Sequence, residues 1–568
     1  MQEDSDLTQP ERSGKLRFRR LDPSKALETL SQRQAKGFVS QRQFSRDTGI
    51  PRTTLQHWIA RKAPKGVEPE ISAFFETPAG IALLKRILLA VHLVCCFCGT
   101  GGIRMVCLFL SLAGLSPFVA SSYGAQHSMA TSIQEHIVTF GKTEKKRLSK
   151  QMPPKKITAC EDENFHSGSP MLVAIEPVSN FILLEQFAEK RDTDTWNAAL
   201  AEAITDMPVE IVQITSDEAK AFIRQAKTLG AQQSPDLFHI QNGVCQAMSL
   251  PLHRQLERAE EEAEDAQKEV LRQEQALAVG KVEPRRQGRP PDFPTRLQGA
   301  RFFKELADGR LTQARAVCTE WRTHLHTIRD GYHPYDLETG APRSPEQLDT
   351  LLGTTFEHLR QISKETHLSE NSRKLLEKSE RMVPKMVATL RFYERCERQQ
   401  IDALGLPPDE EALLRNHLIP AAYLERVARQ SEPAERRRTL QARAVQLRAG
   451  VSQIPLDRLS GLQAVADACI HVFQRSSSCV EGRNGRLSQY HHALRGLTVL
   501  RQNTLTVLHN YLPSQSGEPT PAERFFGARP ADLVGTLLEQ LPDPPRPARS
   551  RKNDPLAQPL ESANWPKR

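Results

Sequence analysis

Two carboxylates at the ends of strand-like runs are the residues of this sequence best placed for chemistry. Asp162 ends the run Lys156–Asp162, and Asp217 lies just past the run Val209–Thr215. Short apolar runs of this kind are typical of strands, and strand ends are where an α/β sheet exposes polar groups to a ligand. Carboxylate oxygens are the ligands that hard cations such as Mg²⁺ prefer. The two acids therefore predict a divalent-cation site.

The elements around these acids follow the order of a mixed α/β sheet. We expect strands at 156–162, 171–177, 181–187, 209–215 and 237–240, and helices at 193–205 and 218–229. Three strands, a helix, a strand, a helix and a strand describe such a sheet. A single acid is more often a solvated loop carboxylate or a helix cap. Because both acids end strands of one α/β unit, metal binding is favoured over that interpretation.

Neighbouring acids compete for the same roles. Glu161 and Glu163 flank Asp162, and the register of the strand decides which side chain points into the site. Asp162 is our choice and Glu163 the alternative. Glu218 competes with Asp217, but we expect Glu218 to begin the next helix, where an acid interacts favourably with the helix dipole.

Length and composition limit the class of protein. At 568 residues the chain is too long for one core, which predicts several domains. The net charge of +9 favours an anionic partner, most commonly nucleic acid, although it can also serve solubility alone. The ten cysteines follow no regular framework, which indicates free thiols in a reducing cytoplasm. Nucleotide-binding loops and a Gly-flanked nucleophilic serine are missing, so nucleotide hydrolysis and acyl transfer have no support.

The segment 38–58 has helix-turn-helix spacing. Ser40 can cap a first helix that buries Phe44, Gly49 supplies a left-handed turn, and a second helix opens near Pro51. The exposed side of the second helix would then meet phosphates and base edges in a major groove of double-stranded DNA. An ordinary pair of packed helices is the alternative. The candidate DNA-binding residues, with the basic flank included, are Arg52, Thr53, Thr54, Gln56, His57 and Arg61.

One apolar stretch, Ile87–Ile103, is a candidate membrane span. It is interrupted by Thr100–Gly102 and falls short of the roughly 20 apolar residues that a span needs. Two buried helices joined by a glycine turn explain it better, so we expect no membrane partner. A helical scaffold or membrane-associated protein is the rival interpretation.

Three segments, together with the strand order, resemble a known family. They are Asp162-Glu-Asn-Phe-His166, Asp192-Thr-Asp-Thr-Trp196 and Ser216-Asp-Glu-Ala-Lys220. They are similar to the ribonuclease-H-like core of DDE transposases from bacterial insertion sequences, in which a large helical insertion precedes the last acidic residue. The resemblance implies a third carboxylate, usually a Glu on a late helix. Its best match is Glu481, within Cys479-Val-Glu481-Gly-Arg-Asn484.

The resemblance also implies a function. Asp162, Asp217 and Glu481 would be the catalytic residues and would hold two Mg²⁺ (or Mn²⁺) ions, with one aspartate bridging them. Two such ions activate the attacking oxygen and stabilise the leaving oxygen in phosphodiester cleavage and strand transfer. The partners would be the DNA of the element ends and of the target, bound by a homodimer or larger assembly in the bacterial cytoplasm, associated with the nucleoid. A catalytically inactive, transposase-derived DNA-binding protein is the alternative.

The expected architecture is a multidomain α plus α/β protein. It has an N-terminal helix-turn-helix region and a ribonuclease-H-like mixed-sheet core that a long helical insertion interrupts. The boundaries that we expect are 1–68 for the N-terminal tail and helix-turn-helix, 69–150 for a second helical DNA-binding or dimerisation region with a basic linker at 142–156, 151–245 for the first part of the core, 246–455 for the helical insertion, 456–530 for the C-terminal helical part of the core, and 531–568 for a Pro-rich basic tail.

Overall fold

The computed structural model describes residues 40–53, 67–166, 168–282, 292–451, 455–494, 496–513 and 517–547. The chain divides into two compact units. One comprises residues 1–142, 492–495 and 531–568, and the other comprises 143–491 and 496–530. Helices predominate in the described ranges, which also contain one five-stranded mixed sheet, so the predicted mixture of α and α/β structure is confirmed.

The first predicted helix of the N-terminal segment is confirmed as α2 (Gln41–Thr48). The Ser40 hydroxyl accepts a hydrogen bond from the Gln43 amide at 3.2 Å, Phe44 is buried, and Gly49 ends the helix with a φ of 67°. The αL conformation at this position is the one that glycine adopts without strain.

The second helix of the predicted helix-turn-helix lies mostly outside the described residues. Arg52 and Thr53 are described and begin a helical turn. The other candidate DNA-binding residues lie outside the described ranges: Thr54, Gln56, His57 and Arg61.

The same unit continues with five helices, α4 (Pro69–Phe74), α5 (Pro78–Val91), η1 (His92–Cys98), α6 (Ile103–Leu112) and the first part of α7 (Tyr123–Ser149), and later contains α22 (Leu533–Gln540). The expected glycine turn between two apolar helices is confirmed. A Cβ at Gly101 would lie 2.6 Å from the Cys95 carbonyl oxygen, so only glycine fits there. The predicted basic linker at 142–156 is wrong in its first half, because α7 continues to Ser149.

One segment of the described ranges, Pro78–Cys98, is long and apolar enough to cross a membrane by length and composition alone. In its most apolar part, 44% of the residues are buried inside the structure, and core helices of soluble proteins pass the same test. This single segment is therefore weak evidence for a membrane span.

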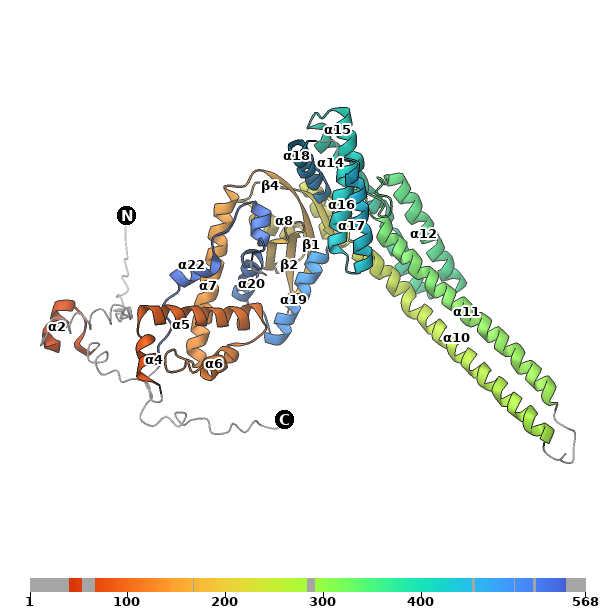
Figure 1. Ribbon diagram of the computed structural model, residues 1–568, viewed down its shortest axis with the longest axis horizontal. Helices are drawn as coiled ribbons and strands as arrows, with labels where there is room; N and C mark the ends of the chain where they lie inside the picture. The colour runs from red at the N-terminus through yellow and green to blue at the C-terminus, as the bar shows by residue number, and fades with distance from the viewer. Residues whose placement is uncertain are drawn as a thin grey trace, which may run out of the picture. The chain divides into compact units, whose positions relative to one another are not determined.

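The sheet contains β1 (Lys155–His166), β2 (Ser169–Glu176), β3 (Phe181–Phe187), β4 (Val209–Ser216) and β5 (Gln232–Pro235) in the spatial order β3-β2-β1-β4-β5 (Figure 1). The β1–β2 and β2–β3 pairs are antiparallel, and the β1–β4 and β4–β5 pairs are parallel. Only β2 therefore runs against the other four strands.

Two helices connect the parallel strands, α8 (Thr193–Ile204) and α9 (Lys220–Leu229). The Asp192 carboxylate caps α8 by accepting from the Thr195 amide at 2.9 Å. Trp196 of α8 is buried against Phe222 of α9, with ring centroids 5.0 Å apart. Both predicted crossover helices are thus present, and they share an aromatic contact.

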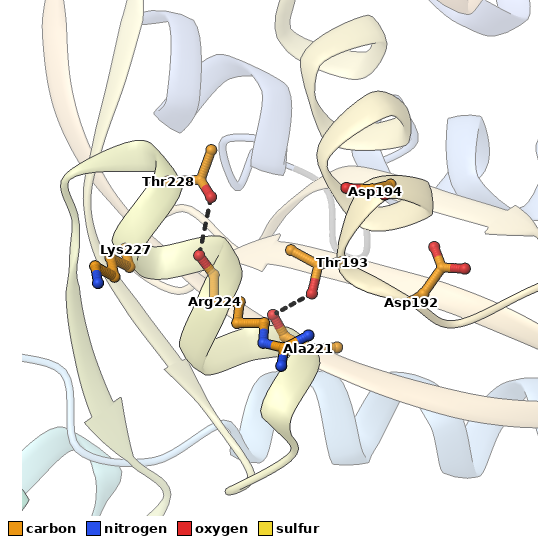
Figure 2. A pocket seen from close by; sticks show the side chains of 7 residues that line it. All are labelled: Asp192, Thr193, Asp194, Ala221, Arg224, Lys227 and Thr228. Carbon is orange, nitrogen blue, oxygen red and sulfur yellow. Dashed lines mark hydrogen bonds between the residues drawn. The ribbon is translucent and has the colours of Figure 1, made fainter.

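A polar pocket of about 470 Å³ lies between α8 and α9 (Figure 2). Asp192 and Asp194 line it at the start of α8, while Arg224 and Lys227 project from α9. It carries charges of both signs on an open surface, and none of the three candidate catalytic acids lines it.

The last predicted strand is wrong. The run Leu237–Ile240 is not a strand but opens the long helix α10 (Leu237–Val282), and β5 lies five residues earlier. Asp236 explains the difference, because its carboxylate accepts from the Phe238 amide at 2.9 Å and its carbonyl from the Ile240 amide at 3.3 Å. These bonds satisfy amides of the first helical turn.

After β5 a large helical insertion begins with an antiparallel pair, α10 and α11 (Phe293–Gly331), which forms a long arm (Figure 1). Ion pairs such as Arg310–Glu262 link its two helices. The rest of the insertion comprises α12 (Pro345–Glu365), α13 (Glu370–Glu380), α14 (Val383–Asp402), α15 (Pro408–Leu413), η2 (Leu414–Leu418), α16 (Ile419–Gln430), α17 (Ala434–Ala449) and α18 (Leu456–His471).

The insertion packs directly on the sheet edge. The Thr389 hydroxyl of α14 lies 2.9 Å from the Ser234 hydroxyl of β5, and both side chains are buried. The chain then returns to the sheet through α19 (Ser478–Leu494), α20 (Val499–Tyr511) and α21 (Pro521–Phe526). The insertion is therefore a structural neighbour of the sheet rather than an independent helical domain.

Candidate metal centre

The two aspartates chosen from the sequence lie at equivalent register positions, Asp162 in β1 and Asp217 just past the end of the adjacent strand β4. In the parallel β1–β4 pair the last facing residues are Cys160 and Thr215. Asp162 and Asp217 each follow two residues later. Asp217 lies just past the end of β4, so the register places the two residues at the same level of the sheet, Asp162 within its strand and Asp217 in the turn that follows β4.

Asp162 does not end its strand, contrary to the prediction. β1 continues to His166 because it pairs with β2, and Asp162 faces Val173 there. The parallel partner β4 ends near this level, so Asp162 lies beside the end of β4 at the middle of β1 rather than at its tip.

The register of β1 distinguishes Asp162 from its acidic neighbours. Glu163 accepts a hydrogen bond from the Trp196 indole of α8 at 3.0 Å, and Glu161 is fully buried on the side of Gln225 in α9. Asp162 instead accepts from the Asn484 side chain of α19 at 2.9 Å. The alternative residue, Glu163, therefore belongs to the side of the sheet covered by α8 and α9.

Two of the candidate acids, Asp217 and Glu481, come within electrostatic reach of the third, Asp162. Glu481 lies in the first turn of α19 and is half-buried. The pKa of Asp162 is raised to about 6, first by burial and then by the negative charges of Glu481 and Asp217. A hydrogen bond from the Glu163 amide and the charge of His239 act in the opposite direction. The fold thus brings together acids that lie far apart in sequence.

Glu218 takes a different role from Asp217. We predicted that Glu218 begins the next helix, but α9 begins at Lys220. The Glu218 carboxylate instead pairs with Lys385 of α14 at 2.5 Å. The Asp217 carboxylate accepts from the Ala219 amide at 2.9 Å in the turn after β4. The prediction for Glu218 is wrong because a cation from the insertion, rather than a helix dipole, balances its charge.

The donor set suits a hard cation, although the acids do not surround one point. Among the described residues, no three His, Cys, Asp or Glu side chains are close enough together to hold one ion. Mg²⁺ keeps several waters and is commonly held by one or two carboxylates plus substrate phosphates. Burial first, and then the like charges of Glu481 and Asp217, raise the Asp162 pKa, so a cation beside Asp162 would be stabilised there.

A short segment between α18 and α19, Val472–Ser477, connects the insertion with Glu481, and we call it the strap. The Gln474 carbonyl accepts from Gln213 of β4 at 2.9 Å, and the Ser477 hydroxyl donates to Asp236 at 2.5 Å. The Arg475 guanidinium donates to the Arg329 carbonyl of α11 at 2.7 Å. The strap therefore fixes the start of α19 against both the sheet and the insertion.

Gln213 is the polar centre of the strap contact. Its buried side chain accepts from Thr158 at 3.1 Å and donates to Ser234 at 2.8 Å as well as to Gln474. Gln213→Leu is expected to lower the free energy of unfolding by several kcal/mol, because each buried polar group left unpaired costs about 1–3 kcal/mol. Urea denaturation measures this loss. Gln186→Leu, at a half-buried site on the edge strand β3, is the control and should change stability little.

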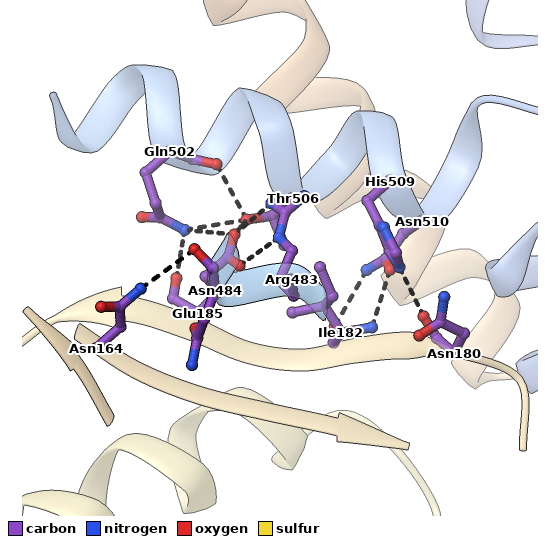
Figure 3. A network of polar contacts seen from close by, with 10 residues as sticks. All are labelled: Asn164, Asn180, Ile182, Glu185, Arg483, Asn484, Gln502, Thr506, His509 and Asn510. Carbon is purple, nitrogen blue, oxygen red and sulfur yellow. Dashed lines mark hydrogen bonds and ion pairs between the residues drawn. The ribbon is translucent and has the colours of Figure 1, made fainter. Parts of the chain in front are cut away.

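A buried ion pair holds α19 on the opposite part of the sheet (Figure 3). Arg483 donates two hydrogen bonds to Glu185 of β3, at 2.6 and 2.7 Å, and both side chains are almost fully buried. Burial alone would raise the pKa of Glu185, but the charge and hydrogen bonds of Arg483, with those of Thr506 and Gln502, bring it below its usual value.

Helix α20 reinforces this arrangement (Figure 3). The Asn510 side chain pairs with both backbone groups of Ile182 on β3, at 2.9 and 3.1 Å, and His509 contacts the Asn180 carbonyl at 2.8 Å. These contacts satisfy the free edge of β3. The position of Glu481 thus depends on α19, which contacts β1 and β3, and on α20, which packs on β3.

Sequence reasoning placed one nearby residue wrongly. We expected His239 on a strand, but it lies in the first turn of α10, 3.8 Å from the buried Asp236 and within electrostatic reach of Asp162. Asp236 is a residue type that commonly caps helices, and it could have indicated a helix start here. The apolar run after it was instead interpreted as a strand.

Comparison with known proteins adds a family without an assigned function. Residues 414–553 match a family of unknown function, DUF6399. The match begins at η2, continues past α22 and includes Glu481 with the strap, but it covers less than half of the chain. No curated protein and no solved structure matches this chain.

Proposed function

We propose that this protein is a DNA transposase of the DDE type, with the sheet as a ribonuclease-H-like catalytic core. The observation that carries this proposal is that the charges of Asp217 and Glu481 both act on Asp162. Asp162 comes from a central strand, Asp217 from the end of its parallel neighbour and Glu481 from a late helix. Those are the kinds of positions that the resemblance implies for the three acids. The strand order, with only β2 reversed, supports the same interpretation.

The three carboxylates would hold Mg²⁺ or Mn²⁺. When bound, two such ions supply a nucleophilic oxygen at neutral pH and stabilise the leaving oxygen of a phosphodiester. The protein's own contribution is positional. Asp162 is oriented by Asn484, the Ala219 amide holds Asp217, and the Arg483–Glu185 pair together with the strap fixes the helix that carries Glu481.

Recognition of DNA is assigned to the N-terminal unit. The capped helix α2 with its glycine turn, the start of a helix at Arg52, and the basic net charge support binding to double-stranded element ends. Assembly as a dimer or larger complex on two ends, in the bacterial cytoplasm, belongs to the same proposal.

Metal-dependent cutting of DNA tests this function. The purified full-length protein is incubated with a supercoiled plasmid that carries the DNA flanking its own gene, with Mg²⁺, with Mn²⁺, and with a chelator. We expect nicked and linear products with either metal, mapped to the element ends, and none with the chelator. Binding of those ends without cutting would instead support the inactive DNA-binding alternative, and neither binding nor cutting would contradict the transposase assignment.

A further inference from the structure

Asn484 makes one hydrogen bond to a candidate acid and has one buried polar atom without a partner among the described residues. Asn484 lies three residues after Glu481 in α19, so the two side chains share a side of the helix. Its Nδ2 donates to Asp162 Oδ2 at 2.9 Å. Asn484 is 8% exposed, and its Oδ1 is buried without a hydrogen-bond donor among the described residues.

The orientation of this amide follows from charge. An ionised aspartate only accepts hydrogen bonds, so the nitrogen of the amide must face it. The oxygen shares a carbon with that nitrogen and therefore lies beside the Asp162 contact. Buried acceptors in folded proteins nearly always have a partner, so an acceptor left without one next to a cluster of acids requires an explanation.

We propose that Asn484 is a further residue of the metal centre, which orients Asp162 through Nδ2 and offers Oδ1 as a neutral oxygen ligand to the cation or to one of its bound waters. This inference rests on the proposed function, because it assigns a residue to that same site. Asn side-chain oxygens are among the ligands that hard cations accept. A neutral ligand adds a donor oxygen without adding to the repulsion among Asp162, Asp217 and Glu481.

Contacts on both sides of Asn484 hold its backbone in place. Arg483, the preceding residue, is fixed by Glu185, and the Asn164 side chain donates to the Asn484 carbonyl at 3.4 Å. The backbone of Asn484 is thus held from both sides, so its side chain has few alternative positions. Figure 3 shows Asn484 between Asn164 on the sheet and the Arg483 contact.

Titration of the metal-free full-length protein with Mn²⁺, followed by electron paramagnetic resonance of the free ion, tests the inference without relying on activity. We expect Asn484→Ala to weaken Mn²⁺ binding by about 10-fold or more, the size of effect seen when groups that orient metal ligands are removed. Asn484→Asp keeps an oxygen at the same place but loses the Nδ2 donor to Asp162, so it should recover only part of the binding that Ala loses. Gln489→Ala removes an exposed amide from the same helix and should bind as the wild type does.

Asp217→Asn separates failure of this inference from failure of the proposed function. If Asp217→Asn weakens Mn²⁺ binding while a folded Asn484→Ala protein binds as tightly as the wild type, the role of Asn484 is overturned and the metal centre stands. If the wild type binds no Mn²⁺, or Asp217→Asn binds unchanged, both proposals fail. Far-ultraviolet circular dichroism and thermal melting establish that each variant is folded. Should the Ala variant not fold, the same comparison is made with Asn484→Ser.

Discussion

Asparagine in place of Asp162 is expected to lower the rate of metal-dependent DNA cleavage by about 10³-fold or more, which corresponds to about 4 kcal/mol of transition-state stabilisation. The substitution preserves the shape of the side chain but removes its negative charge. That charge interacts with two neighbouring acids and would bind the proposed ions. Single-turnover nicking measures the effect. Glu210→Gln, at an exposed site on β4, is the matched control and should cut at the wild-type rate.

Although Asp162→Asn should abolish most cleavage, it should not destabilise the folded protein at alkaline pH. Because the folded-state pKa of Asp162 is raised to about 6, its ionised form destabilises the folded protein above that pH. In a chelator at pH 8, Asp162→Asn should therefore be at least as stable as the wild type in urea. The difference should shrink as the pH falls through about 6, where Asp162 takes up a proton. Loss of cleavage together with a large loss of stability at pH 8 would contradict this account.

Methionine in place of Arg483 is expected to lower the free energy of unfolding of the sheet unit by about 3–5 kcal/mol, because it leaves the Glu185 carboxylate buried without its partner. Glu185→Gln combined with Arg483→Met should recover part of that loss, since no uncompensated charge remains. Fluorescence of buried Trp196 during urea unfolding reports on this unit. The other tryptophans, Trp58, Trp321 and Trp565, are replaced by Phe in all compared proteins.

The stability contributed by the Arg483–Glu185 pair should also depend on pH. The pKa of Glu185 is below its usual value, so its ion pair contributes stability above the unfolded-state pKa and loses it as the pH falls through the folded-state pKa. The advantage of the wild type over the double variant should therefore be greatest near neutral pH. Arg458→Met breaks the exposed pair with Glu410 and should cost less than about 1 kcal/mol. If Arg483→Met and Arg458→Met lower the free energy of unfolding equally, the stabilising role of the buried Arg483–Glu185 pair is contradicted.

Much of the sheet could be predicted from the sequence, because its buried strands are short apolar runs. The run at Phe181–Phe187 and the helix after Asp192 agree closely with β3 and α8. β5 could not be predicted in this way, because Gln232 and Gln233 carry no apolar pattern and pair only with β4. A four-residue apolar run such as Leu237–Ile240 fits the start of a helix as well as a strand.

The candidate site was predictable only in part. Asp162 and Asp217 lie at the same level of the sheet because β1 and β4 pair in parallel. The order of strands and helices in the sequence is enough to suggest such a pairing. The proximity of Glu481 depends on tertiary contacts, the strap and the Arg483–Glu185 pair, that leave no periodic signal in the sequence. The same holds for the Asn484–Asp162 hydrogen bond, which joins a strand to a helix beyond the whole insertion.

The most direct test of the central claim, that three acids far apart in sequence line one metal centre, is radical cleavage of the polypeptide by a bound metal. Fe²⁺ is bound in place of Mg²⁺, and ascorbate with peroxide then generates hydroxyl radicals that cut the chain near the ion. Mass spectrometry maps the cuts. We predict cuts in three separate segments, near Asp162, near Asp217 and near Glu481, that excess Mg²⁺ suppresses and Asp217→Asn abolishes. Cuts confined to one segment, or cuts elsewhere that Asp217→Asn leaves unchanged, would contradict it.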